Sequence, residues 1–197
     1  MNIKQLLIFV IVSLLSACSL GGKLIIMDEK KEQTNSFYNY FSVSVDTGLT
    51  KHDKIDLIFY DVFADASIFD LISPTWQYKI GIRPDSSKVE KCILVKIEPR
   101  SFVFGGYTLF SGNYQSEINI EKEQYFPLEP GGKEYSNIVY AGKLSLNSET
   151  KGFKVDSSGK EKCDLELSKQ YTQIDFTKST NAAALREKRE NEKAKKK

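Results

Sequence analysis

The 197-residue sequence contains few of the residues that most often carry catalysis or bind metals, with one histidine and three cysteines. Because His52 is the sole histidine, every Ser-His-Asp triad or Cys-His pair would have to use it. His52 lies in the polar stretch LTKHDK, which favours a solvated turn. Neither Gly-x-x-x-x-Gly-Lys nor Gly-x-Gly-x-x-Gly occurs in the sequence, which excludes the common phosphate-binding loops.

The N-terminal apolar run is too short to cross a membrane. From Leu6 to Leu15 it has ten residues, whereas a membrane-spanning helix needs about 20. A charge at Lys4, this short apolar run and the small residues that follow are typical of a secretory signal. We therefore expect residues 1–17 to be removed.

The residues at the end of this run, Leu15-Ser16-Ala17-Cys18, resemble the lipobox of bacterial lipoproteins. The resemblance implies that Cys18 becomes the first residue of the mature chain and carries fatty acyl chains such as palmitate. Two or more acyl chains anchor a protein stably, so the lipid would replace a transmembrane helix. Ser19 stands where the inner-membrane retention rule would want Asp, which points to the outer membrane, on its periplasmic or surface face. The alternatives are an ordinary secretory signal and a buried apolar helix.

The mature chain from Cys18 fits one domain with flexible ends. Polar and glycine-rich composition predicts a lipidated tether over residues 18–36, a domain over 37–178 and a charged helix or tail over 179–197. For the final helix, Ser179 or Thr180 offers an N-cap. That helix has no apolar stripe, so we expect it to project into solvent.

Within the domain, apolar residues alternate with polar ones, which indicates β-strands. Phe37, Phe41, Val43 and Val45 share one face of such a strand, opposite Tyr38 and Tyr40. Strands are expected at 37–45, 55–63, 76–82, 102–110, 115–121, 137–146, 152–156 and 162–168, and a short helix at 64–73. The segment 55–63 is apolar on both faces, which predicts a central strand. Short strands separated by turn signals predict a mostly β fold, an antiparallel β-sandwich with a C-terminal helical tail.

A second resemblance covers residues 104–146. FGGYTL followed by YFPLEPGGKEYSNIVYAGKLSL looks like the turn motifs of small bacterial lipoproteins that contain a prealbumin-like, carboxypeptidase-regulatory-like or Ig-like sandwich. The motifs concern turns: Gly105 and Gly106 permit unusual backbone angles, and Pro130-Gly131-Gly132 reverses the chain. The resemblance therefore implies a fold and no activity. A lipoprotein of type VI secretion machines has a similar sandwich and anchor.

Two cysteines remain after lipidation, Cys92 and Cys163, and a location outside the cytoplasm would permit them to pair. Alternation in VEKCILVKI places Cys92 on the face opposite Ile93 and Val95, away from the expected core. The sequence leaves the disulfide open.

Candidate catalytic residues have ordinary structural interpretations. Ser148 and Lys151 match the Ser-x-x-Lys of penicillin-recognising enzymes, but they lie in a turn before Gly152. Several aspartates are spread along one segment, and we interpret them as charges that keep the protein soluble and protect a sheet edge. Paired catalytic acids or a calcium site would need the carboxylates closer together. The aspartates are Asp53, Asp56, Asp61, Asp65 and Asp70. Several tyrosines could line a sugar-binding or protein-binding face, but aromatic residues on strands more often pack in the core or pair across strands. These tyrosines are Tyr38, Tyr40, Tyr107, Tyr114, Tyr125, Tyr135 and Tyr140. We predict no catalytic residue, metal site or cofactor.

Charge is divided unevenly along the mature chain. Before Ser179 it has 20 basic and 23 acidic residues, counted without Lys4, and from Ser179 onward 7 basic and 3 acidic residues. Basic residues confined to a terminal run argue against nucleic-acid binding. The segment from Arg186 to Lys197 could instead contact peptidoglycan or another anionic surface.

Taken together, these features predict a non-enzymatic, lipid-anchored envelope protein that binds or scaffolds a protein partner at the outer membrane. The alternatives are an envelope hydrolase, a peptidoglycan-binding lipoprotein and a type VI secretion-like assembly lipoprotein.

Overall fold

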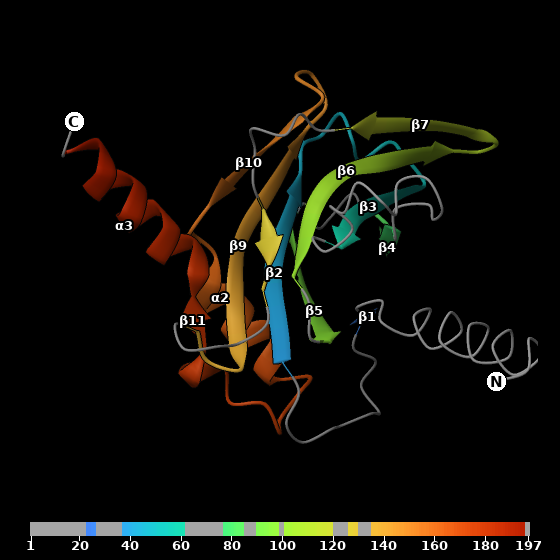
Figure 1. The fold of residues 1–197 in the computed structure, drawn as a ribbon. Coiled ribbons are helices and arrows are strands. Elements are labelled where there is room, and N and C mark those ends of the chain that lie inside the picture. Colours follow the sequence, from blue (N-terminus) through green and yellow to red (C-terminus); the bar gives the residue numbers. More distant parts are fainter. Residues whose placement is uncertain are drawn as a thin grey trace, which may run out of the picture.

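The computed structural model of the chain describes residues 23–26, 37–61, 77–84, 90–98, 101–119, 126–129 and 135–195. Within these residues the protein is mostly β, with two sheets and two α-helices (Figure 1). The expected signal peptide, the lipobox cysteine Cys18 and the expected helix at 64–73 lie outside the described residues. The fold is consistent with the β-sandwich that the sequence predicts.

The first sheet, sheet A, is mixed rather than purely antiparallel. Its strands follow the order β1 (Lys23–Ile26), β5 (Glu90–Glu98), β2 (Phe37–Val45), β9 (Ile138–Asn147) and β10 (Gly152–Asp156). Strands β2 and β9 run parallel, and the short β11 (Thr180–Asn181) also pairs with β9 in parallel. Strand β1 lies inside the segment expected to be a tether and pairs with β5, Lys23 opposite Glu98.

The second sheet, sheet B, is antiparallel. Its order is β4 (Gln77–Ile82), β3 (Lys54–Asp61), β6 (Phe102–Ser111) and β7 (Tyr114–Asn119), and β8 (Pro127–Leu128) also pairs with β6. Strand β3 has neighbours on both sides, so the prediction of a central strand from its two apolar faces is confirmed.

The main core lies between the two sheets. Phe41 and Val43 from sheet A meet Leu57 and Phe59 from sheet B, and their side chains are almost fully buried. Asn39 also lies on this inner face, and its amide makes two hydrogen bonds with the backbone of Glu129, at 2.7 and 3.1 Å. Those bonds satisfy a buried polar group and join β2 to the segment that follows β8.

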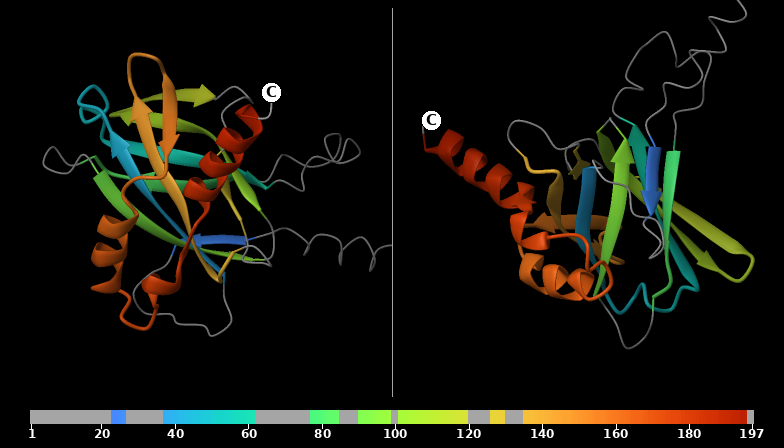
Figure 2. Two further views of the ribbon diagram at one scale, coloured as in Figure 1. Left: turned by 90° about the vertical axis from the view of Figure 1, so that its left-hand side faces the viewer. Right: turned by 90° about the horizontal axis from the view of Figure 1, so that it is seen from below.

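The outer face of sheet A is buried as well. Helix α2 (Lys160–Ser168) and the 3-10 turn η2 (Phe176–Lys178) cover it, as the two views in Figure 2 show. Tyr38 and Tyr40 on β2 face away from the main core, as the alternation of residues predicts. Because α2 and η2 cover this side of the sheet, both tyrosines pack in a second apolar cluster. This cluster explains why both faces of β2 are buried.

The segment expected to be a strand at 162–168 is helix α2, so that prediction is wrong. Cys163 and Leu167 lie four residues apart, on one face of the helix, and both are buried, whereas Leu165 is 62% exposed. Gly159, in a left-handed conformation with φ of 82°, precedes the helix. A side chain at this position would come within 3.1 Å of Ser42 Oγ and Tyr140 Oη, so glycine allows the helix to start close to the sheet.

Glycines mark irregular points in two strands, and the sandwich resemblance singled out two of them, Gly105 and Gly106. Gly105 is the extra residue of a β-bulge in β6, because Phe104 and Gly106 pair with consecutive residues of β3. A Cβ atom on Gly106 would lie 2.3 Å from the carbonyl oxygen of Ile118. Gly142, with φ of 130°, follows a second bulge, in β9. The expected turn at Pro130-Gly131-Gly132 lies outside the described residues.

Helix α3 (Ala182–Ala194) follows β11 and projects beyond the sheets (Figure 1). Asn181 caps it by accepting a hydrogen bond from the backbone N–H of Ala184 at 3.1 Å, so the predicted caps, Ser179 and Thr180, were wrong. Ala182 and Ala183 are buried at its base, and the rest of the helix is mostly exposed, as its composition predicts.

Candidate functional site

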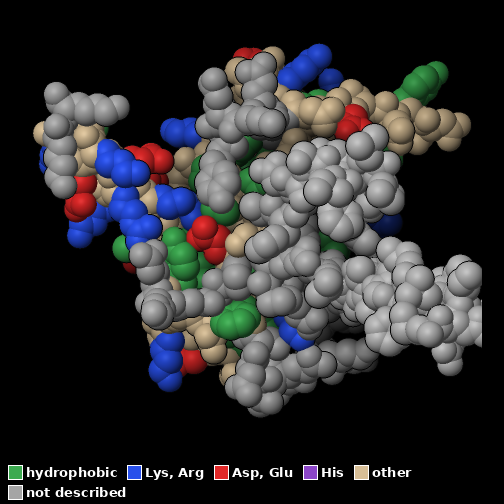
Figure 3. All heavy atoms as spheres, in the orientation of Figure 1, with side chains coloured by type: hydrophobic (Ala, Val, Ile, Leu, Met, Phe, Trp, Pro, Cys, Tyr) green, Lys and Arg blue, Asp and Glu red, His purple; other side chains and the backbone are tan. Residues whose placement is uncertain are grey.

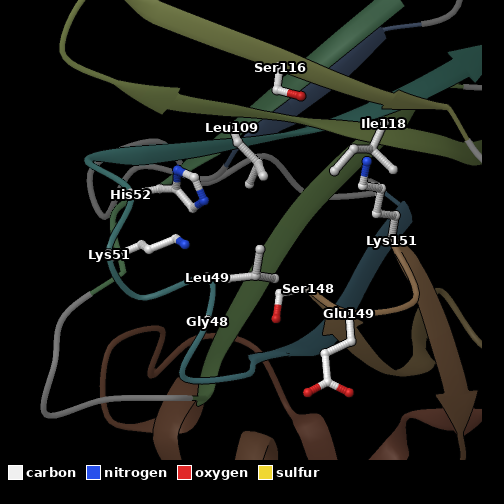
Figure 4. A pocket seen from close by; sticks show the side chains of 10 residues that line it. All are labelled: Gly48, Leu49, Lys51, His52, Leu109, Ser116, Ile118, Ser148, Glu149 and Lys151. Carbon is white, nitrogen blue, oxygen red and sulfur yellow. The ribbon is translucent and has the colours of Figure 1, made fainter.

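A pocket of about 280 Å³ opens at one end of the sandwich (Figure 4). Three segments far apart in sequence line it: the β2–β3 loop, the β6–β7 hairpin and the β9–β10 turn. The lining residues are Gly48, Leu49, Lys51, His52, Leu109, Ser116, Ile118, Ser148, Glu149 and Lys151. Three of these residues were candidates from the sequence, His52 by itself and Ser148 with Lys151 in one motif, but the sequence did not predict that His52 lies beside the other two.

The apolar part of the pocket comes from Leu49, Leu109 and Ile118. Leu49 is 1% exposed and Leu109 is 8% exposed, so both belong to the edge of the main core. The β6–β7 register places Leu109 opposite Ser116 and Tyr107 opposite Ile118. The hydroxyl of Tyr107 donates a hydrogen bond of 3.4 Å to the carbonyl of Asn147, which links the two sheets beside this end of the sandwich.

Asp46 holds two of the three lining segments together. Its carboxylate accepts hydrogen bonds from the Ser148 backbone N–H at 2.6 Å, the Ser148 hydroxyl at 2.8 Å and the Leu49 backbone N–H at 3.1 Å. Burial on its own would raise the pKa of Asp46, but these hydrogen bonds outweigh it and lower the pKa. A Cβ atom on Gly48 would lie 2.2 Å from Ser148 Oγ, so glycine permits the close approach of loop and turn.

The residues considered for hydrolysis have separate hydrogen-bond partners. Ser148 lies in a turn, as expected, and its hydroxyl donates to Asp46. His52 is half-buried in the β2–β3 loop, and its Nδ1 is 2.7 Å from Ser111 Oγ. In Figure 4 Leu49 lies between His52 and Ser148. These contacts favour a structural role for Asp46 and Ser148 over a Ser-His relay.

The two aspartates of the 53–70 segment whose side chains are described, Asp53 and Asp56, do not line the pocket. Asp53 accepts a hydrogen bond of 2.6 Å from the Gly112 backbone N–H. Asp56 is 5% exposed and lies 2.8 Å from Lys54 Nζ, so at this position the expectation of a solubilising surface charge is wrong. The side chains of Asp61, Asp65 and Asp70 lie outside the described part of the chain.

Most tyrosines of the suggested aromatic face are core residues. Tyr38, Tyr40, Tyr107 and Tyr140 are at most 9% exposed. Tyr135 is partly exposed, and Tyr125 lies outside the described residues. Tyr114 differs, because it is 83% exposed.

Tyr114 begins strand β7 at the tip of the β6–β7 hairpin, which extends beyond the rest of sheet B in Figure 1. All residues of β7 except Ile118 are exposed. Among the described residues β7 is the end strand of sheet B; it contains neither lysine nor proline, and Glu117 is its one charged side chain. Tyr114 therefore gives the tip of this hairpin a large exposed aromatic side chain.

Cys92 and Cys163 form a disulfide bond that ties α2 to β5. Beside it, the hydroxyl of Tyr40 donates to Asp164, which also lies 2.5 Å from Lys160 Nζ. Burial, followed by the hydrogen bond to Asp164, raises the pKa of Tyr40. Burial also raises the pKa of Tyr140 to about 12, and its hydroxyl donates to the carbonyl of Ser158. These hydrogen bonds give the buried hydroxyl groups of Tyr40 and Tyr140 partners beneath α2.

Contacts of Arg186 and Glu187 hold the base of helix α3 against the domain. Arg186 Nη2 donates to the carbonyl of Ala141 at 2.6 Å, and Glu187 accepts two hydrogen bonds of 2.8 Å from Ser157. From Lys188 to Lys195 every residue is exposed. Figure 3 shows Lys and Arg side chains gathered over this helix. The C-terminal segment thus forms an exposed helical arm.

Among the described residues, no group of three or more His, Cys, Asp or Glu side chains is arranged to hold a metal ion. Of the helices in the same part of the chain, none combines the length and apolar character needed to cross a membrane. Comparison with known proteins adds no relative: no protein-family model, no curated protein and no solved structure matches this chain.

Proposed function

We propose that this protein is a non-enzymatic, lipid-anchored component of the bacterial cell envelope that binds a protein partner at the outer membrane. Its anchor is Cys18, and its partner-binding surface is the exposed β6–β7 hairpin. The proposal rests on the pairing of the cysteines more than on any other observation.

The chain has three cysteines, and two of them, Cys92 and Cys163, are joined to each other. Disulfides persist mainly in oxidising compartments outside the cytoplasm. The remaining cysteine is the one that follows the apolar run and the small residues of a lipobox-like sequence. The disulfide therefore supports an exported protein in which Cys18 is available for acylation.

The hairpin supports binding of a partner rather than catalysis. It presents Tyr114, which is 83% exposed, and a six-residue strand whose residues are nearly all accessible. Tyrosine is enriched in protein interfaces because its ring supplies apolar area and its hydroxyl a hydrogen bond. The hydrogen bonds at the pocket give Ser148 and His52 different partners, which lends the hydrolase alternative little support.

The anchor is tested by growing bacteria that produce the full chain with an alkyne analogue of palmitate. We expect the wild-type protein to incorporate the label and to sediment with outer membranes. The Cys18→Ser variant should lose both properties, whereas Cys92→Ala/Cys163→Ala, the matched control, should keep the label. An unlabelled wild-type protein that retains residues 1–17 would refute the anchor.

The partner surface is tested with a photocrosslinking amino acid at Tyr114 in living cells. We expect one discrete crosslinked protein at this position. The control position is Leu165, which is 62% exposed on α2, on the outer face of sheet A. Equal crosslinking at both positions, or none at Tyr114, would contradict a binding role for the hairpin.

A further inference from the structure

The pocket at the end of the sandwich combines an apolar floor with positive charge on two sides. Leu49, Leu109 and Ile118 form the floor, and Lys51 and Lys151 come from two different lining segments. We infer that this pocket binds a small amphipathic anion, a short apolar chain that ends in a carboxylate. This inference goes beyond the proposed function and does not depend on the lipid anchor.

The size of the pocket limits the ligand to a small molecule. Its volume of about 280 Å³ is close to the lower end of the range for small-molecule sites, about 300–1,000 Å³. Leu49 and Leu109 are held by the main core, so the floor is formed before any ligand arrives. An alkyl chain of about six carbons placed on this floor would remove apolar surface from water, which favours binding.

The charge around the pocket selects an anion. Lys51 and Lys151 are exposed, and neither forms an ion pair within the described part of the chain. The nearby carboxylate of Asp46 is already engaged by three hydrogen bonds. In Figure 4 the carboxylate of Glu149 points away from Lys51 and from the apolar floor. Of the charged side chains that line the pocket, two are lysines and one is Glu149, so the balance of charge favours an anion.

The backbone at Lys151 is consistent with a positioned side chain. Its φ of 50° is the only positive value at a non-glycine residue in the described part of the chain. A left-handed conformation is unfavourable for a residue that carries a side chain. In Figure 4 this turn places Lys151 beside Ile118, across the pocket from Lys51.

The test measures binding of 6,6,6-trifluorohexanoate to the full chain by ¹⁹F NMR line broadening. The acylated chain is measured in nanodiscs of zwitterionic lipid and a chain without acyl groups in buffer, and broadening by empty nanodiscs or by buffer alone is subtracted. We expect saturable binding that weakens about tenfold in Lys51→Gln/Lys151→Gln, a loss that corresponds to about 1.4 kcal/mol. Glutamine keeps most of the side chain and removes only the charge.

The matched control is Lys154→Gln, which removes an exposed charge on β10 outside the pocket. It should bind within about twofold of the wild type, because Lys154 does not line the pocket. A second probe, 6,6,6-trifluorohexanol, has the same chain without the negative charge and should bind much more weakly. The inference is overturned if the alcohol binds as tightly as the acid, if the double variant binds as the wild type does, or if the acid shows no saturable binding.

Discussion

Reduction of the Cys92–Cys163 disulfide should destabilise the domain substantially. The two residues are 71 positions apart. In the chain-entropy model, release of a loop of this length lowers the free energy of unfolding by about 4 kcal/mol. With a dependence on urea of about 2 kcal/mol per molar, the unfolding midpoint should fall by about 2 M. Comparing oxidised and reduced forms of the same chain avoids the cavities that substitutions would introduce.

The assay is urea unfolding followed by circular dichroism, with and without a phosphine reductant. Amide hydrogen exchange should show where the reduced protein opens first. We expect this in α2, because Cys163 holds the helix covalently and Leu167 is its other buried contact. The Cys92→Ala/Cys163→Ala variant is the control and should not respond to reductant. A midpoint shift below about 0.3 M in the wild type would refute the reasoning.

Three further substitutions test individual contacts by the same unfolding measurement. Asp46→Ala should cost about 2 kcal/mol, because the N–H groups of Ser148 and Leu49 lose their acceptor. The folded-state pKa of Asp46 lies below its ordinary value of 3.8, so the cost of the substitution should be greatest above about pH 4 and become smaller as the pH falls through the lower folded-state value. A cost that grows on acidification would contradict the assignment. Gly106→Ala should cost at least about 2 kcal/mol, since the new Cβ would overlap a backbone carbonyl, and an unchanged midpoint would show that β7 can shift. Asn181→Ala should cost about 1 kcal/mol and reduce helical circular dichroism through fraying of α3, whereas unchanged helicity would assign the cap elsewhere.

The strands could be predicted largely because their side chains alternate. The two faces of β2 and the double apolar face of β3 were both evident from the order of residues. The alternation did not reveal what covers the outer face of sheet A, since that depends on α2, far along the chain. Nor did it reveal that β2 and β9 run parallel, because strand periodicity is the same in either direction.

Helix α2 was mistaken for a strand for a specific physical reason. Apolar residues at 163, 165 and 167 satisfy a period of two, but 163 and 167 also satisfy the four-residue spacing of a helix. Tertiary contacts decide between the two: Cys163 bonds to Cys92 and Leu167 packs below the sheet, while Leu165 remains exposed.

The pocket could not be predicted for a different reason. Its residues come from three connections, and their meeting depends on how the sheets stack, which the sequence does not state directly. Asp46, which fastens the loop to the turn, carried no motif. One general signal pointed to this region, because the loops at one end of a sandwich often carry binding residues.

The early position of strand β1 has a consequence for how an acylated chain would stand on a bilayer. Lys23, where β1 begins, is five residues after Cys18, and an extended chain covers at most about 3.6 Å per residue. The linker between Cys18 and β1 would then be no longer than about 18 Å. The β1 side of the sandwich would therefore stay close to the lipid headgroups. Helix α3 leaves the molecule from the opposite side, beside β9 and β10 (Figure 1). In a chain anchored in this way, helix α3 would point away from the bilayer, and its lysine and arginine side chains would be free to contact molecules on that side.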